Sequence, residues 1–171
     1  MSLRLEEIEL IRRLKYSYSR AIDTGDMATV AGLFAEDATV DYRGGSYHVR
    51  LTGRDAIVAA LAGMFNPQFV GSHTVHMPVI DILGDDEATG TWTLLDYALN
   101  LAEGNKTTVG AAIYRDRYVR QGGRWLIAHS EYDRVYERVY VDPAPGLTAH
   151  FLAQRGRHDP RSRQAAGTDR P

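Results

Sequence analysis

The amino-acid sequence predicts an α+β fold in which helices come first and an antiparallel sheet follows. Two observations lead to this prediction. Apolar residues recur at helical spacing in much of the chain up to about residue 65. Four long runs rich in β-branched and aromatic residues, separated by glycine-containing turns, then fill most of residues 72–139. Because the two patterns are segregated and do not alternate, a parallel α/β sheet is excluded.

Three helices are expected before the sheet. The first ends near Gly25, because glycine is a common helix stop. Its apolar face consists of residues at helical spacing: Leu5, Ile8, Ile11, Leu14, Tyr18 and Ile22. Asp26 is expected to cap a second helix that runs to about Ala35. A third helix is expected over residues 53–64, and Asn66-Pro67 breaks it.

Six extended segments are expected. Two short strands, 38–43 and 47–51, are separated by a Gly-Gly turn. Four long runs follow, over residues 72–83, 88–103, 107–121 and 124–139, and hairpin turn signals separate them. Residues 143–156 have room for one more short helix. Residues 1–156 therefore read as a single domain, and the polar stretch 157–171 reads as a disordered tail.

Size and composition are those of an ordinary globular domain. The chain has 171 residues, of which 44% are hydrophobic and 25% are charged. Its net charge of -2, from 20 basic and 22 acidic residues, leaves no long-range field to attract nucleic acid. The absence of cysteine excludes disulfides, thiolate catalysis and cysteine-ligated zinc. With no membrane-spanning apolar run and no signal peptide, a cytoplasmic protein is expected.

Two polar residues, Asp23 and His73, suggest acid–base chemistry. Asp23 lies at the end of the first helix, and His73 lies at the start of a long strand. An Asp that hydrogen-bonds to one imidazole nitrogen fixes the tautomer and leaves the other nitrogen to accept a proton near neutral pH. An acid at a helix C-terminus also opposes the helix dipole, so it needs a partner. The alternatives are a structural His, and an Asp that only satisfies donors in its own turn.

A third acid, Asp96, is expected on an inward face. Strand alternation places it on the same face as Trp92 and Leu94. Burial among apolar residues would favour its protonated form, so it would serve as proton donor to a leaving hydroxyl. The alternative is an exposed position near a strand end.

Several other residues are expected to contact a substrate. The phenols of Tyr18 and Tyr42 suit a carbonyl oxygen that gains negative charge. The last strand alternates so that His129 shares a face with Trp125 and Ile127. The expected substrate-binding set is Tyr42, His129, Trp92, Phe65 and Met64.

A metal site is not expected. His73 and His76 would point to opposite faces of a strand and are poorly placed to chelate an ion together.

Four segments carry a resemblance to a known family: AIDTGDMATVAGLFAEDATVDY, GRDAIVAAL, SHTVHMPVIDILGDDEATGTW and YRDRYVRQGGRWLIAHSEY. Over roughly residues 5–140 the chain resembles the SnoaL-like members of the nuclear transport factor 2-like superfamily. The resemblance implies a cystatin-like fold, with a curved mixed or antiparallel sheet that forms a cone-shaped half-barrel around the helices. It also implies a pocket at the open end and a homo-oligomer, either a dimer or a trimer.

The resemblance also implies roles for individual residues. Asp23 and His73 occupy the places of an Asp and a His shared by scytalone dehydratase and bile acid 7α-dehydratase. Tyr18 and Tyr42 match tyrosines that contact substrate oxygens in these enzymes, and Asp96 matches an Asp of the bile acid enzyme in its spacing. Hexachlorocyclohexane dehydrochlorinase is similar but has a Lys in place of Tyr18 and lacks the acid at Asp96. This departure favours water over halide as the leaving group.

The sequence thus predicts a cofactor-free lyase, a dehydratase acting on a small hydrophobic, oxygenated ring compound. His73, oriented by Asp23, would remove a proton next to a carbonyl, and Asp96 or water would assist departure of hydroxide. An isomerase or polyketide-cyclase-type enzyme with the same base is the alternative among enzymes. A non-catalytic binding or assembly protein of the same fold is the alternative outside them. No cofactor, nucleic acid or membrane partner is expected.

Overall fold

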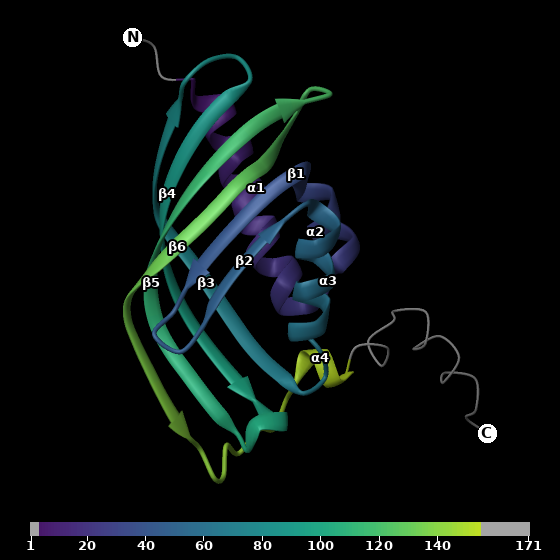
Figure 1. Ribbon diagram of the computed structural model, residues 1–171, viewed down its shortest axis with the longest axis vertical. Helices are drawn as coiled ribbons and strands as arrows, with labels where there is room; N and C mark the ends of the chain where they lie inside the picture. The colour runs from purple at the N-terminus through teal and green to yellow at the C-terminus, as the bar shows by residue number, and fades with distance from the viewer. Residues whose placement is uncertain (1–3, 155–171) are drawn as a thin grey trace, which may run out of the picture.

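A six-stranded sheet curves around the N-terminal helices (Figure 1). The computed structural model describes residues 4–154. The helices are α1 (Leu5–Thr24), α2 (Met27–Leu33), α3 (Arg54–Met64) and α4 (Phe151–Gln154), and a single 3-10 turn covers Leu101–Glu103. The strands are β1 (Phe34–Arg43), β2 (His48–Thr52), β3 (Phe69–Ile82), β4 (Glu87–Asn100), β5 (Lys106–Gln121) and β6 (Arg124–Val141). Within this range, no helix is both long and apolar enough to cross a membrane.

The sheet is mixed and unclosed. Its strand order is β2-β1-β6-β5-β4-β3, with β1 parallel to β6 and every other neighbouring pair antiparallel. The long strands β3 to β6 form a meander, and β1 returns to pair with the last of them. This arrangement confirms the predicted α+β class and the curved sheet around N-terminal helices.

Most element boundaries lie within two residues of the sequence prediction, and the larger differences are at the starts of β1 and β3, which begin at Phe34 and Phe69, and at the end of β4. Helix α2 ends at Leu33 and not near Ala35, because Phe34 is already extended and pairs with Ile127 of β6. Strand β4 ends at Asn100 and not at residue 103, because the Asn100 side chain accepts a hydrogen bond from the backbone of Ala102 and starts the 3-10 turn. The predicted tail, 157–171, lies outside the described residues.

The junction between α1 and α2 fixes where the first helix ends. Gly25 adopts a left-handed conformation with φ of 65°, and its N–H is bonded to the carbonyls of the last turn. The next residue, Asp26, caps α2 by accepting hydrogen bonds from the N–H and hydroxyl of Thr29, at 3.1 and 2.7 Å. Asp23, two residues before the turn, is thereby held where α1 packs against β3.

Two bulges in β6 decide which of its side chains face the helices. Opposite β5, one extra residue, Ala128, sits between the partners of Arg117 and Tyr118, and a second, Val135, sits between the partners of Ala111 and Ala112. Each extra residue shifts the alternation by one. On β6, inward-facing residues therefore change from Trp125 and Ile127 before the first bulge to Ser130, Tyr132 and Arg134 after it.

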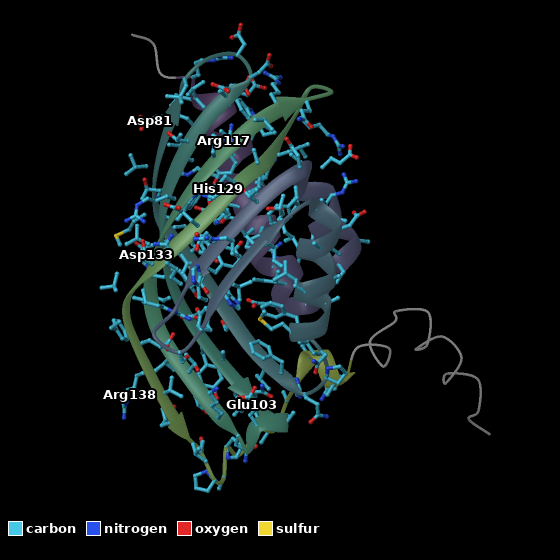
Figure 2. All side chains as sticks on the ribbon, in the orientation of Figure 1. Asp81, Glu103, Arg117, His129, Asp133 and Arg138 are labelled. Carbon is cyan, nitrogen blue, oxygen red and sulfur yellow. The ribbon has the colours of Figure 1, made fainter. Side chains whose placement is uncertain are left out.

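The first bulge corrects the prediction for His129. After Ala128, His129 falls on the outer face of β6, together with Asp133 (Figure 2). There the Nδ1 atom of His129 is hydrogen-bonded to the hydroxyl of Thr39 at 2.6 Å. His129 therefore does not share a face with Trp125 and Ile127, and it does not line a pocket.

The left-handed turn after α1 yields a first testable expectation. Replacing Gly25 with Ala should lower the free energy of unfolding by about 1–2 kcal/mol, because a Cβ at positive φ crowds the following carbonyl. Gly32→Ala is the matched control, since Gly32 lies inside α2 and an added Cβ meets no atom within 4 Å. That change should raise the free energy of unfolding by up to about 1 kcal/mol. Urea unfolding measures both, and effects of the same sign would contradict the expectation.

Candidate active site

A cavity of about 290 Å³ lies between the helices and the concave face of the sheet. One part of its wall is apolar and consists of Ile22, Val49, Leu61, Met64, Phe65, Phe69 and Ala98. Another part is polar and includes Tyr18, Tyr42, Tyr47, His73, Asp96, Tyr114, Tyr132 and Arg134. A container with an apolar wall and a few convergent polar groups is the usual form of a small-molecule site.

Most of the predicted site residues line this cavity, and three do not. Asp23 instead lines an adjoining hollow, which it shares with His73. Met64 and Phe65, from the end of α3, belong to the apolar wall as expected. Trp92 faces inward but is packed deeper in the core, where its indole N–H donates to the hydroxyl of Tyr118 at 2.9 Å. Trp92 and the outward-facing His129 are therefore not cavity residues.

Asp23 and His73 meet, as the sequence predicts. The Nδ1 atom of His73 lies 2.6 Å from one carboxylate oxygen of Asp23, and the backbone N–H of His73 donates to the other oxygen at 2.9 Å. The two side chains are largely enclosed, with exposed fractions of 11% for His73 and 23% for Asp23. Because a carboxylate accepts, Nδ1 carries the hydrogen in this pair. The second ring nitrogen, Nε2, has no hydrogen-bond partner within residues 4–154.

Asp96 faces the cavity, and it lies directly opposite His73 on the neighbouring strand. Its two oxygens accept hydrogen bonds from the guanidinium of Arg134, at 2.5 and 2.9 Å. Both side chains are almost fully buried, so the pair is bidentate and well shielded. The predicted inward face is therefore found, but Asp96 is the partner of a cation and has no free oxygen to carry a proton.

Arg134 organises a wider polar group on the same wall. It also donates to the hydroxyl of Tyr47 at 2.8 Å, and its Nε lies 3.4 Å from the carboxylate of Glu137. Burial alone would lower the pKa of Arg134, but the hydrogen bonds that it donates to Asp96 raise this pKa above its usual value. Arg134 therefore remains a cation. Its role was missed from the sequence because the bulge at Ala128 turns Arg134 to the inner face of β6. The only signal in the sequence was that a buried Asp96 needs a cation.

The phenols of Tyr18 and Tyr42 are adjacent on the cavity wall. Their hydroxyls are hydrogen-bonded to each other at 3.2 Å, and the ring of Tyr42 stacks on that of Tyr132 with centroids 4.7 Å apart. Burial is the main cause that raises the pKa of both Tyr18 and Tyr42. Both residues are thus neutral phenols at physiological pH and act as hydrogen-bond donors and acceptors.

A metal site is not found in the described part of the chain. No three His, Asp, Glu or Cys side chains within residues 4–154 are grouped as metal ligands would be. His73 faces the cavity. His76 lies three residues further along β3, where it pairs with Thr93 of β4.

Comparisons with known proteins agree with this architecture. The model of the SnoaL-like domain matches residues 3–131. A protein of Novosphingobium aromaticivorans DSM 12444, provisionally named a scytalone dehydratase, is 26% identical, with 85% of this chain and 97% of that chain covered and a TM-score of 0.70. The hexachlorocyclohexane dehydrochlorinase LinA-type3 of Novosphingobium barchaimii LL02 is 19% identical, with coverage of 84% and 94% and a TM-score of 0.70. A second N. aromaticivorans protein, provisionally named an aromatic ring hydroxylase, is 18% identical, with coverage of 84% and 99% and a TM-score of 0.72.

The buried Arg134 cluster yields a second testable expectation. Arg134→Met should lower the free energy of unfolding by about 3–5 kcal/mol, because Asp96 and Glu137 would be left buried without their cation. Arg115→Met is the matched control, since Arg115 pairs with Asp133 on the exposed face and should lose less than about 1 kcal/mol. Equal losses in urea unfolding would show that the cluster is not a buried charge system.

Proposed function

The chain belongs to the SnoaL-like domain family, and from that premise we propose that it is a cofactor-independent lyase of the dehydratase type. The observation that carries this proposal is the 2.6 Å contact between Asp23 and His73, whose ring lines the cavity. The similar protein named a scytalone dehydratase supports elimination of water as the reaction class.

In the proposed reaction, His73 is the base. Its Nε2 atom removes a proton next to a carbonyl of the substrate, and Asp23 stabilises the imidazolium that forms. The carbonyl accepts the electron pair, and its oxygen is bound by a phenol of the tyrosine wall that Tyr18, Tyr42 and Tyr114 form together. The electron pair then returns to form the carbon–carbon double bond as the carbon–oxygen bond of the hydroxyl breaks.

The departing hydroxyl needs a proton, and the geometry restricts its source. Asp96 is engaged by Arg134 through both oxygens, so it does not supply one. The imidazolium of His73 carries the proton that it has just removed, and it can return that proton to the departing oxygen. The hydroxyl then leaves as water, and His73 is neutral again for the next turnover. A single residue thus serves as base and then as acid.

The cavity indicates the kind of substrate. Its volume of about 290 Å³ suits a small molecule, and its apolar wall suits a hydrophobic ring. The hydroxyls of the tyrosines and the His73 ring together suit two oxygen functions on that ring, a carbonyl and a hydroxyl one carbon further from it. A β-hydroxy ketone on a hydrophobic ring is therefore the proposed substrate class.

One observation favours a second candidate, an isomerase. Because Asp96 is not available as a separate acid, the proton on His73 can also return to another carbon of the same substrate. This outcome moves a double bond without loss of water. Product analysis distinguishes the two reactions, since only the lyase product is lighter by one water molecule.

A panel of cyclic β-hydroxy ketones tests the proposal. His73→Ala should lower kcat/KM by at least about 100-fold, because it removes the base, while the fold and ligand binding are retained. His129→Ala is the matched control, since His129 lies on the outer face and should leave turnover unchanged. Circular dichroism confirms that both variants are folded. Full turnover by His73→Ala would end the proposal.

A further inference from the structure

A fully enclosed ion pair lies behind one wall of the cavity. The Nζ atom of Lys15, from α1, is 2.7 Å from a carboxylate oxygen of Asp116, from β5, and neither side chain has any exposed surface. The hydroxyls of Ser130 and Tyr118 each donate to Asp116 at 2.7 Å. Three donors converge on the two oxygens of Asp116, which therefore act only as acceptors. Burial lowers the pKa of Lys15, and Asp116 opposes this effect.

The ammonium of Lys15 also faces two tyrosine rings of the cavity wall. Its Nζ atom lies 3.5 Å from the centre of the Tyr114 ring and 5.4 Å from that of the Tyr18 ring. At the shorter distance, the cation is attracted strongly by the electrons of the ring face. A cation in this position draws electron density from the phenol and makes its O–H a stronger hydrogen-bond donor.

The hydrogens of Tyr18 and Tyr42 are engaged within the wall. Ser130 uses its one hydrogen on Asp116, so it can only accept from Tyr42, with which it is hydrogen-bonded. Tyr42 then accepts from Tyr18. On the adjoining side, Tyr47 and Tyr132 are hydrogen-bonded to each other.

Tyr114 is different, because its hydroxyl has no hydrogen-bond partner anywhere in residues 4–154. The residue lines the cavity and is otherwise buried, with 3% of its surface exposed. Burial is the main cause that raises its pKa well above 10, so the group keeps its hydrogen at neutral pH. In Tyr114 the wall thus presents a phenol whose hydroxyl has no partner among the described residues and whose ring rests on a cation.

We propose that Tyr114 is a specificity residue that donates a hydrogen bond to a substrate oxygen carrying or gaining negative charge, and that Lys15 is a positioning residue that strengthens this donor through the ring face. This inference rests on the proposed function, which supplies such an oxygen. It also assigns a purpose to the Lys15–Asp116 pair, which does not itself line the cavity.

The probe for this inference is 4-nitrophenol, a small ring compound whose neutral and anionic forms have different absorption spectra. Titration above and below its own pKa gives the dissociation constant of each form. Tyr114→Phe, which keeps the ring, should weaken binding of the anion by about ten- to a hundredfold and leave binding of the neutral form within a few-fold of the wild type. Tyr97→Phe is the matched control, since Tyr97 does not line the cavity and should change neither constant.

The role of Lys15 is tested with a double variant, Lys15→Met with Asp116→Asn, which removes both charges without leaving either one buried alone. This variant should weaken binding of the anion by a smaller factor than Tyr114→Phe does, and it should leave the neutral form nearly unchanged. Circular dichroism and the neutral-form constant confirm that the cavity is intact. An unchanged constant for the anion would overturn the role of Lys15.

Two further outcomes test the assignment of Tyr114 and its independence from His73. If Tyr114→Phe binds the anion as tightly as the wild type does, or if Tyr18→Phe alone loses this binding, the assignment of Tyr114 is wrong. His73→Ala should still bind the anion, because His73 acts on carbon and not on this oxygen. His73→Ala therefore tests the lyase proposal through turnover, and Tyr114→Phe tests this inference through anion binding. Failure of one proposal is distinguishable from failure of the other.

Discussion

The carboxylate of Asp23 joins the end of α1 to strand β3 beside the cavity, and the orientation of His73 depends on this contact. Strand β3 is at the edge of the sheet, so its outward-pointing N–H groups have no strand partner on that side. Asp23 accepts one of them, that of His73, and with its other oxygen it holds the imidazole of the same residue. One side chain thus satisfies an edge donor, docks the end of α1 and orients the ring. Because the left-handed Gly25 follows two residues later, α1 cannot continue past this contact.

Local sequence patterns were sufficient to predict this part of the structure. The end of α1 was signalled by glycine, the start of β3 by a change of residue type, and the need of Asp23 for a partner by its place at a helix C-terminus. Alternation along β4 was likewise sufficient to place Asp96 on the inner face, since that strand pairs with β5 in one unbroken register. These conclusions depend only on neighbours along the chain or on uninterrupted periodicity.

The other side-chain orientations in the site depend on two β-bulges that the sequence of β6 alone does not reveal. In β6, an extra Ala128 turns His129 outward, and an extra Val135 leaves Arg134 as the last residue of its inward-facing run. Bulges arise from the fit between two strands, so the alternation of a single strand does not reveal them. The pairing of Lys15 with Asp116 is a similar case. It joins the first helix to the fifth strand, and an isolated lysine on a helical pattern looks the same whether it faces solvent or the core.

The buried charges around the cavity bear on why this wall is polar at all. Hydrophobic residues of similar volume often give equal or greater stability than a buried ion pair, because desolvation of the two charges offsets their attraction. This chain nevertheless buries Lys15 with Asp116 on one side of the tyrosine cluster and Arg134 with Asp96 on the other. The two pairs come from different elements and share only their position around one cavity. Their common effect is to hold phenols and a guanidinium in place within the buried wall, and in that environment a hydrogen bond to a developing negative charge is stronger than it would be in solution. Stability therefore does not account for the polar wall, whereas the proposed function would, because it requires donors preorganised around a reacting oxygen.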